Sequence, residues 1–219
     1  MVARKLFEEN LQELHESLLR MGLLVEEAIY KSVKSFTEND TVLAQSVIEN
    51  DKAINQYEVD IEKKCFELIA TQQPVGTDLR RIGTMLKVVT DLERMGDHAV
   101  NIAKIAIELK NDLYLKPFAR IPEMAETVKE MVHEGLSAYI TLNEEKAVEV
   151  SKQDDQIDRD FRIIFNELME DMKQNKANIH HASFMILVLQ HLERIGDYVT
   201  NVCEWIVYLK TGTIVDLNR

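Results

Sequence analysis

Residues 91–103 read DLERMGDHAVNIA, and residues 191–203 read HLERIGDYVTNVC. The shared positions recur at a constant shift of 100 residues: Glu93, Arg94, Gly96, Asp97 and Asn101 return as Glu193, Arg194, Gly196, Asp197 and Asn201. A long internal repeat decides the architecture of a chain. A fold needs only its apolar positions to repeat. The repetition of Glu-Arg-x-Gly-Asp therefore indicates that these groups also share a function.

Around the two motifs, apolar residues recur every three or four positions, which predicts long α-helices. The 219-residue chain contains only 7 Gly and 3 Pro, so few positions interrupt such helices. The predicted helices cover approximately residues 4–36, 41–70, 77–110, 123–141, 144–172 and 179–210. The two motifs lie on the third and the sixth of them.

The helix before each motif helix also repeats, at a shift of 103 residues, so that Asp51 matches Asp154 and Asn55 matches Asp158. Each half therefore contains three helices joined by short turns, which favours an antiparallel bundle. We predict an all-α fold of two tandem-repeated antiparallel three-helix bundles with six long helices. The first repeat is expected at residues 1–111, a linker at 112–122, and the second repeat at 123–219. A single continuous six-helix array is the alternative.

The bulk composition excludes several classes of function. A net charge of −12 argues against a basic surface for nucleic acid or for an anionic membrane. The two cysteines, Cys65 and Cys203, form no CxxC motif, so we expect neither a disulfide framework nor a zinc–thiolate site. The charged, amphipathic N-terminus does not have the pattern of a signal peptide, and no apolar run is long enough to cross a bilayer. We therefore expect a cytoplasmic protein that reaches membranes only through partners.

The repeated polar residues are spaced to share helix faces. Glu93, Asp97 and Asn101 are four residues apart and form one stripe. Their second-half counterparts Glu193, Asp197 and Asn201 form another. Asp51 with Asn55, and Asp154 with Asp158, are comparable pairs on the preceding helices.

Because those helices run antiparallel to the motif helices, each pair can face a motif. At a rise of ~1.5 Å per residue, measured from the intervening turn, the heights agree to within about 6 Å in the first half and about 5 Å in the second.

Facing acidic pairs repel each other, and a cation between them would remove that cost. Their oxygen ligands favour Mg²⁺, Ca²⁺, Mn²⁺ or iron over zinc or copper. The predicted ligands are Asp51, Asn55, Glu93, Asp97, Asn101, Asp154, Asp158, Glu193, Asp197 and Asn201. Gly96 and Gly196 lie inside helices, where glycine is unfavourable, so another helix or a ligand is expected to approach there. The alternative is a solvated face on which Arg94 pairs with Asp97 and Asp91.

The tandem LERxGDxxxN helices, with Pro74 and the helix opening at Asp78-Leu79-Arg80, resemble the PhoU family of bacterial phosphate-uptake regulators. The resemblance spans essentially the whole chain. It implies a negative regulator of the phosphate-starvation (Pho) regulon that acts with the ATPase subunit of the high-affinity phosphate ABC transporter and with a phosphate-sensor histidine kinase. It also implies a cytoplasmic homodimer.

The resemblance further implies carboxylate-bound divalent or ferric ions. Family members bind these ions through E(D)xxxD motifs, which correspond here to Glu93/Asp97, Glu193/Asp197 and Asp154/Asp158. Asn55 stands where the second half has Asp158, and Tyr198 where the first half has His98. The two sites are therefore expected to differ in metal affinity.

Three hypotheses remain after the sequence alone. The first is a regulatory, non-enzymatic interaction protein with an acidic metal-binding face. The second is a carboxylate–metal enzyme on a helical bundle. A di-iron bundle requires two ExxH motifs, whereas only Glu130–His133 matches this pattern. The third is a purely structural helical module. Elemental analysis and a deletion strain separate these hypotheses.

Overall fold

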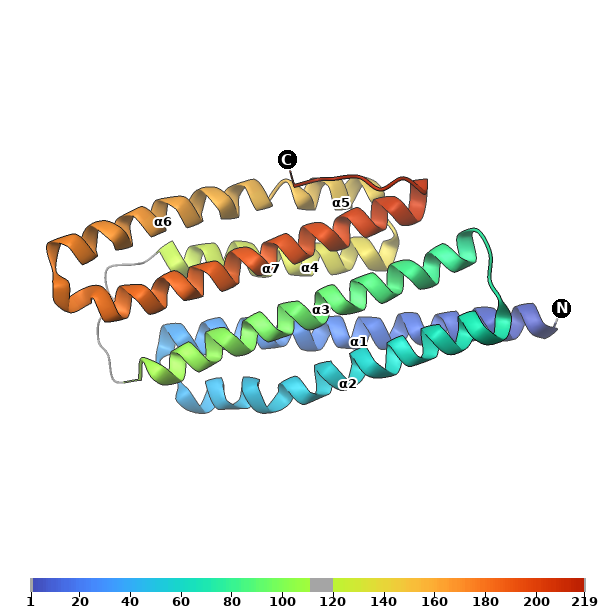
Figure 1. The fold of residues 1–219 in the computed structure, drawn as a ribbon, viewed down its shortest axis with the longest axis horizontal. Coiled ribbons are helices and arrows are strands. Elements are labelled where there is room, and N and C mark those ends of the chain that lie inside the picture. Colours follow the sequence, from blue (N-terminus) through green and yellow to red (C-terminus); the bar gives the residue numbers. More distant parts are fainter. Residues whose placement is uncertain (1, 111–119, 219) are drawn as a thin grey trace.

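The computed structural model describes residues 2–110 and 120–218, and its regular structure over these residues is helical (Figure 1). The first half consists of α1 (Val2–Glu38), α2 (Thr41–Gln72) and α3 (Thr77–Glu108). The second half consists of α4 (Arg120–Thr141), α5 (Glu144–Ser151), α6 (Asp154–Gln174), the short 3₁₀ helix η2 (Lys176–Asn178) and α7 (Ile179–Thr211). The predicted all-α fold of two repeated three-helix units is confirmed, with α5 and α6 together matching α2.

Apolar stripes at helical spacing hold each half together. On α2, the heptad positions Val47, Ile54, Ile61 and Leu68 are all buried, as their spacing predicts. Asp40 begins this helix by accepting hydrogen bonds from the backbone N–H groups of the next turn. The buried side chains of both halves form one continuous hydrophobic cluster.

The predicted helix over 144–172 is interrupted at residues 152–153, between α5 and α6. The Ser151 hydroxyl donates to the carbonyl of Val148 at 3.0 Å, and the Gln153 N–H bonds the carbonyl of Val150 at 2.9 Å. These bonds to the third preceding residue tighten the chain into a 3₁₀-type turn. At the matching position α2 has Ile48, and that helix continues unbroken.

Most of the predicted linker at 112–122 lies outside the described residues, because residues 111–119 are not described. Its last three residues, 120–122, belong to α4, which begins at Arg120. Pro122 falls in the first described turn of α4, where a proline costs no intrahelical hydrogen bond. Over residues 2–110 and 120–218, no helix combines the length and the apolar character needed to cross a bilayer.

The two motif helices, α3 and α7, pack against each other in opposite directions at the junction of the halves (Figure 1). Asp91 near the middle of α3 contacts Trp205 late in α7, and His98 further along α3 contacts His191 earlier in α7. The two copies of the motif are thus brought close together, with α2 and α6 on their outer sides.

Candidate metal centre

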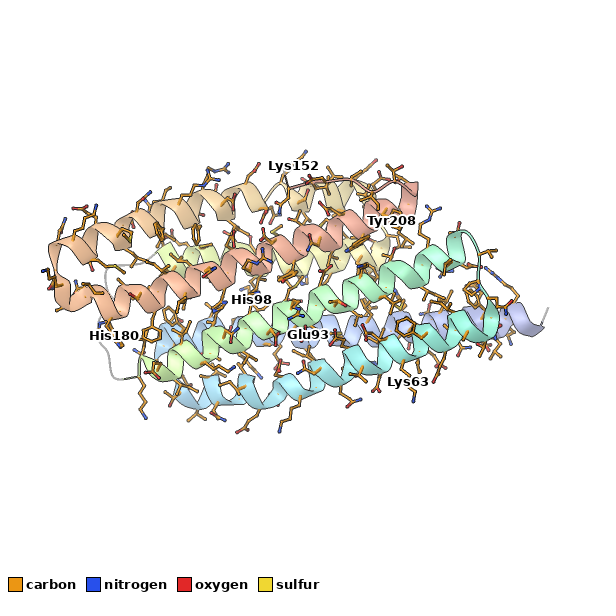
Figure 2. All side chains as sticks on the ribbon, viewed as in Figure 1. Lys63, Glu93, His98, Lys152, His180 and Tyr208 are labelled. Carbon is orange, nitrogen blue, oxygen red and sulfur yellow. The ribbon has the colours of Figure 1, made fainter. Side chains whose placement is uncertain are left out.

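In the first half, α2 approaches the motif helix at Gly96. A Cβ atom added at Gly96 would lie 3.2 Å from Ile54 Cδ1 and 3.7 Å from Asp51 Oδ1. Asp51 is therefore level with the motif, as the antiparallel arrangement predicts. The glycine permits a close helix–helix approach and brings the α2 carboxylate beside Glu93 and Asp97. Figure 2 shows Glu93 near the middle of α3.

The second half repeats this arrangement with tighter contacts. A Cβ atom at Gly196 would lie only 2.8 Å from Asp154 Oδ1 and 3.0 Å from Ile157 Cδ1. Asp154 opens α6 directly after the break at residues 152–153, where its negative charge is favoured by the helix dipole. The break that the periodicity did not predict thus directly precedes the buried carboxylate of this site.

Asp51 on α2 and its counterpart Asp154 on α6 each have one buried carboxylate oxygen without a hydrogen-bond partner in the described part of the chain. Among the described residues, Asp51 Oδ1 and Asp154 Oδ1 are buried and accept no hydrogen bond. The Asp154 residue is only 6% exposed. An unsatisfied buried oxygen of this kind costs the protein about 1–3 kcal/mol. A hard cation would satisfy these oxygens, so the residues present fit a metal ion.

The carboxyl groups of the first acidic face have raised pKa values. Burial, followed by the charges of Asp97 and Glu58, raises the pKa of Glu93 to about 7. Burial is also the main cause that raises the pKa of Asp51, opposed by a hydrogen bond from Asn55. These carboxyl groups resist ionisation because they are buried and, to a smaller extent, because they face other carboxylates; a bound cation would favour their charged forms.

The second half shows the same strain. Burial, followed by the charges of Asp197, Asp158 and Glu193, raises the pKa of Asp154 to about 7. Burial and Asp197 likewise raise the pKa of Glu193, which Arg194 partly offsets. The acidic groups that the sequence assigned to one face are thus close enough to repel one another.

The motif arginines occupy part of each acidic face. Arg194 Nη1 donates to Asp197 Oδ2 at 2.6 Å, whereas the matching distance from Arg94 to Asp97 is 3.6 Å. Arg94 also lies 3.5 Å from Glu93. The i+3 pairing expected for a salt-bridged surface is therefore present in both copies.

Within the described part of the chain, no three His, Cys, Asp or Glu side chains converge as a ready-made coordination shell. A metal ion could be held there only after side-chain movement, including rotation of the arginines.

The predicted ligand Asn201 does not join the acidic face. Its side-chain amide lies 3.5 Å from Asp91 Oδ1, on the side of α7 that packs against α3. Trp205 Nε1 donates to the other oxygen of Asp91 at 3.1 Å. Asp91 thus bonds across the junction rather than to Arg94, contrary to the pairing expected at i−3. Asn101 is half-buried on α3, one helical turn after Asp97.

Glu58 is a member of the first-half face that sequence reasoning missed. Burial, then the charges of Glu62 and Asp97, raises its pKa, and Glu58 in turn raises the pKa of Glu93. The sequence spacing could have identified it, because Glu58 lies seven residues after Asp51 and therefore on the same helix face. The second half has Phe161 at this position. Asn55 and Glu58 in the first half thus correspond to Asp158 and Phe161 in the second.

Comparison of the chain with known protein families and structures agrees with this duplicated arrangement. The model of the PhoU domain matches the chain twice, over residues 18–106 and 121–206, so each match contains one motif helix. The chain belongs to the PhoU family. A protein of Clostridium acetobutylicum named phosphate-specific transport system accessory protein PhoU homolog is 44% identical over 99% of this chain and 100% of its own length. A PhoU homolog of Aquifex aeolicus is 41% identical over 96% of this chain and 95% of its own.

Solved PhoU structures have the same fold. The crystal structure of PhoU from Pseudomonas aeruginosa matches with a TM-score of 0.92 and 35% identity, covering 94% of this chain and 100% of that one. The crystal structure of the phosphate transport system regulatory protein PhoU from Streptococcus pneumoniae matches with a TM-score of 0.90 and 34% identity, covering 96% and 99%. The PhoU architecture thus extends over nearly all of the chain.

Proposed function

We propose that this chain is a regulator of phosphate uptake that accompanies a phosphate-specific transport system. The observation that carries the proposal is the double match to the PhoU domain, together with full-length similarity to proteins named as accessory to that system. Regulation would consist of restraining the transporter and keeping the phosphate-starvation regulon off when phosphate is ample.

We further propose that its partners are the transporter's ATPase subunit and a phosphate-sensor histidine kinase, met in the cytoplasm by a homodimer. The support is the family membership. A charge of −12 makes a protein partner with a basic surface more favourable than nucleic acid or an anionic bilayer. The function is non-enzymatic in this proposal, because the relatives are named accessory and regulatory proteins.

The acidic faces are proposed to bind divalent or ferric ions. In the first half the ligands would come from Asp51, Glu58, Glu93 and Asp97, and in the second from Asp154, Asp158, Glu193 and Asp197. A bound cation supplies positive charge that lets these carboxyl groups ionise together. Oxygen donors favour iron, Mg²⁺, Mn²⁺ or Ca²⁺. The ion would thereby set the charge of the surface that meets the partners.

A deletion strain grown in ample phosphate tests the regulatory proposal. Phosphate-starvation genes should be expressed without the gene and silent again once it is restored. Full repression in the deletion strain would contradict the proposal.

Complementation with a Glu93→Ala/Glu193→Ala variant then asks whether the acidic faces are needed. A Glu67→Ala/Glu145→Ala variant, which removes the same charge from two exposed positions, is the matched control. Hydrolytic or redox turnover that disappears in the first variant alone would instead favour the enzyme hypothesis.

A further inference from the structure

The segment after α7 folds back toward the second acidic face. Gly212 ends α7 in the left-handed conformation, with φ of 77°, and the chain then doubles back along α7 (Figure 1). The Leu217 N–H donates to Glu204 Oε1 at 2.8 Å, and the Leu217 side chain packs against the hydrophobic core. These contacts fix the position of the next residue, Asn218. We call residues 213–218 the C-terminal strap.

The strap ends on a carboxylate of the motif. Asn218 Nδ2 donates to Asp197 Oδ1 at 3.4 Å, while Arg194 donates to Asp197 Oδ2 at 2.6 Å. Both oxygens of Asp197 are thereby engaged. The Asp197 side chain is 20% exposed, whereas that of Asp97, its counterpart in the first half, is 44% exposed.

We propose that the C-terminal strap is a built-in competitor that closes the second acidic face, so that a cation binds there only when the strap is released. This inference rests on the metal-binding face proposed above. The buried Asp154 Oδ1 accepts no hydrogen bond among the described residues, so the closed face leaves this oxygen without a donor. The strap therefore gives the second site a lower metal affinity than the first. A cation that binds the second site displaces the strap.

Manganese provides a direct probe, because free Mn²⁺ is counted by electron paramagnetic resonance. We compare three chains with the intact protein: a truncation after Gly212, Asn218→Ala, and the control Ile214→Ala, whose side chain is 74% exposed. The truncation keeps the glycine that ends α7. Loss of the strap should tighten the weaker class of sites about tenfold, the change expected from removing hydrogen bonds to a charged group. Asn218→Ala should tighten it less, and the stronger class should not change.

Hydrogen exchange on the intact chain gives an independent readout that does not depend on any variant folding. The Leu217 amide should be protected without metal and should exchange faster at saturating Mn²⁺.

Two binding classes that are unchanged by both the truncation and Asn218→Ala, with Leu217 still protected, would overturn the strap and leave the metal faces intact. An absence of Mn²⁺ binding to the intact and the truncated chains would overturn both proposals.

Discussion

In the first half of the molecule, Asp97 is 44% exposed and its arginine stays 3.6 Å away; in the second, Asp197 is 20% exposed and is held by both Arg194 and Asn218. The two faces carry the same motif on equivalent helices. The duplicated halves have kept the acidic groups and diverged in the groups that compete for them. At the proposed metal sites, affinity would therefore depend on these competitors as well as on the number of carboxylates.

The opposing helices diverge in the same sense. From the sequence, Asn55 makes the first half the poorer site because the second half has Asp158. The structure adds Glu58 to the first half and places Arg162 3.3 Å from Asp158 in the second. We therefore expect the first half to bind a cation more tightly, the reverse of what the substitution of Asn55 alone suggests.

The largest difference between the halves is expected from filling the two glycine contacts. Gly196→Ala places a methyl group 2.8 Å from Asp154 Oδ1, whereas Gly96→Ala meets no atom closer than 3.2 Å. Overpacking should lower the free energy of unfolding by about 1–3 kcal/mol in Gly196→Ala. In Gly96→Ala, the gain in helix propensity of about 1 kcal/mol should offset most of the cost. Urea denaturation followed by circular dichroism measures both, and equal losses would show that the two contacts are alike.

The next difference concerns pH in metal-free protein. Burial and neighbouring carboxylates raise the pKa of Asp154 to about 7, so folding favours its neutral form. The contribution of Asp154 to stability is then greatest below pH of about 4 and falls as the pH rises to about 7. Asp154→Asn should therefore be more stable than the unmodified chain by about 1–2 kcal/mol at pH 8, after allowance for solvent screening, and equal to it near pH 4.

Asp51→Asn is the matched control for this pH effect. Its gain at pH 8 should be smaller, because a hydrogen bond from Asn55 partly offsets the rise that burial causes in the pKa of Asp51. Thermal unfolding at pH 4, 6 and 8 in the presence of chelator gives the three curves. A stability advantage of Asp154→Asn that does not depend on pH would contradict the assignment.

Glu58→Gln tests the residue that distinguishes the first face. The substitution keeps the shape of the side chain and removes one of the charges that raise the pKa of Glu93. Mn²⁺ affinity of the stronger class should fall about fivefold, equivalent to about 1 kcal/mol, while the weaker class stays the same. Glu67→Gln, at an exposed position further along α2, is the control. An equal loss in both variants would assign the effect to general charge.

The smallest difference is expected from the arginines. Arg194→Gln removes a 2.6 Å contact to Asp197, and Arg94→Gln removes a 3.6 Å contact to Asp97. Exposed ion pairs are worth about 0–1 kcal/mol, so each effect on affinity is modest. Arg194→Gln should tighten the weaker class of sites by more than Arg94→Gln tightens the stronger one. Calorimetric titration with Mn²⁺ compares them, and the opposite order would mean that the arginines do not compete with the ion.

The duplicated helices and the level acidic groups were predictable, because helical period and rise are fixed by backbone geometry. Asp51 and Asp154 face their motifs as that geometry requires. The break at residues 152–153 was not predictable, since the apolar periodicity that predicted one helix over 144–172 does not reveal the turn closed by the bond from the Gln153 N–H to the carbonyl of Val150. The helix rotation that turns Asn201 toward Asp91, and the strap contact of Asn218, arise from tertiary packing that periodicity does not encode.

The most direct measurement is anomalous scattering from crystals of the intact chain soaked at increasing Mn²⁺ concentration. We expect a first peak between α2 and α3 beside Glu93 and Asp97, and a second between α6 and α7 beside Glu193 and Asp197 only at higher concentration. Peaks at both faces at saturating Mn²⁺, with a peak only at the first face at lower Mn²⁺ concentration, would support unequal affinities of the two sites. Peaks that avoid both acidic faces at saturating Mn²⁺ would contradict the proposal that these faces bind metal ions.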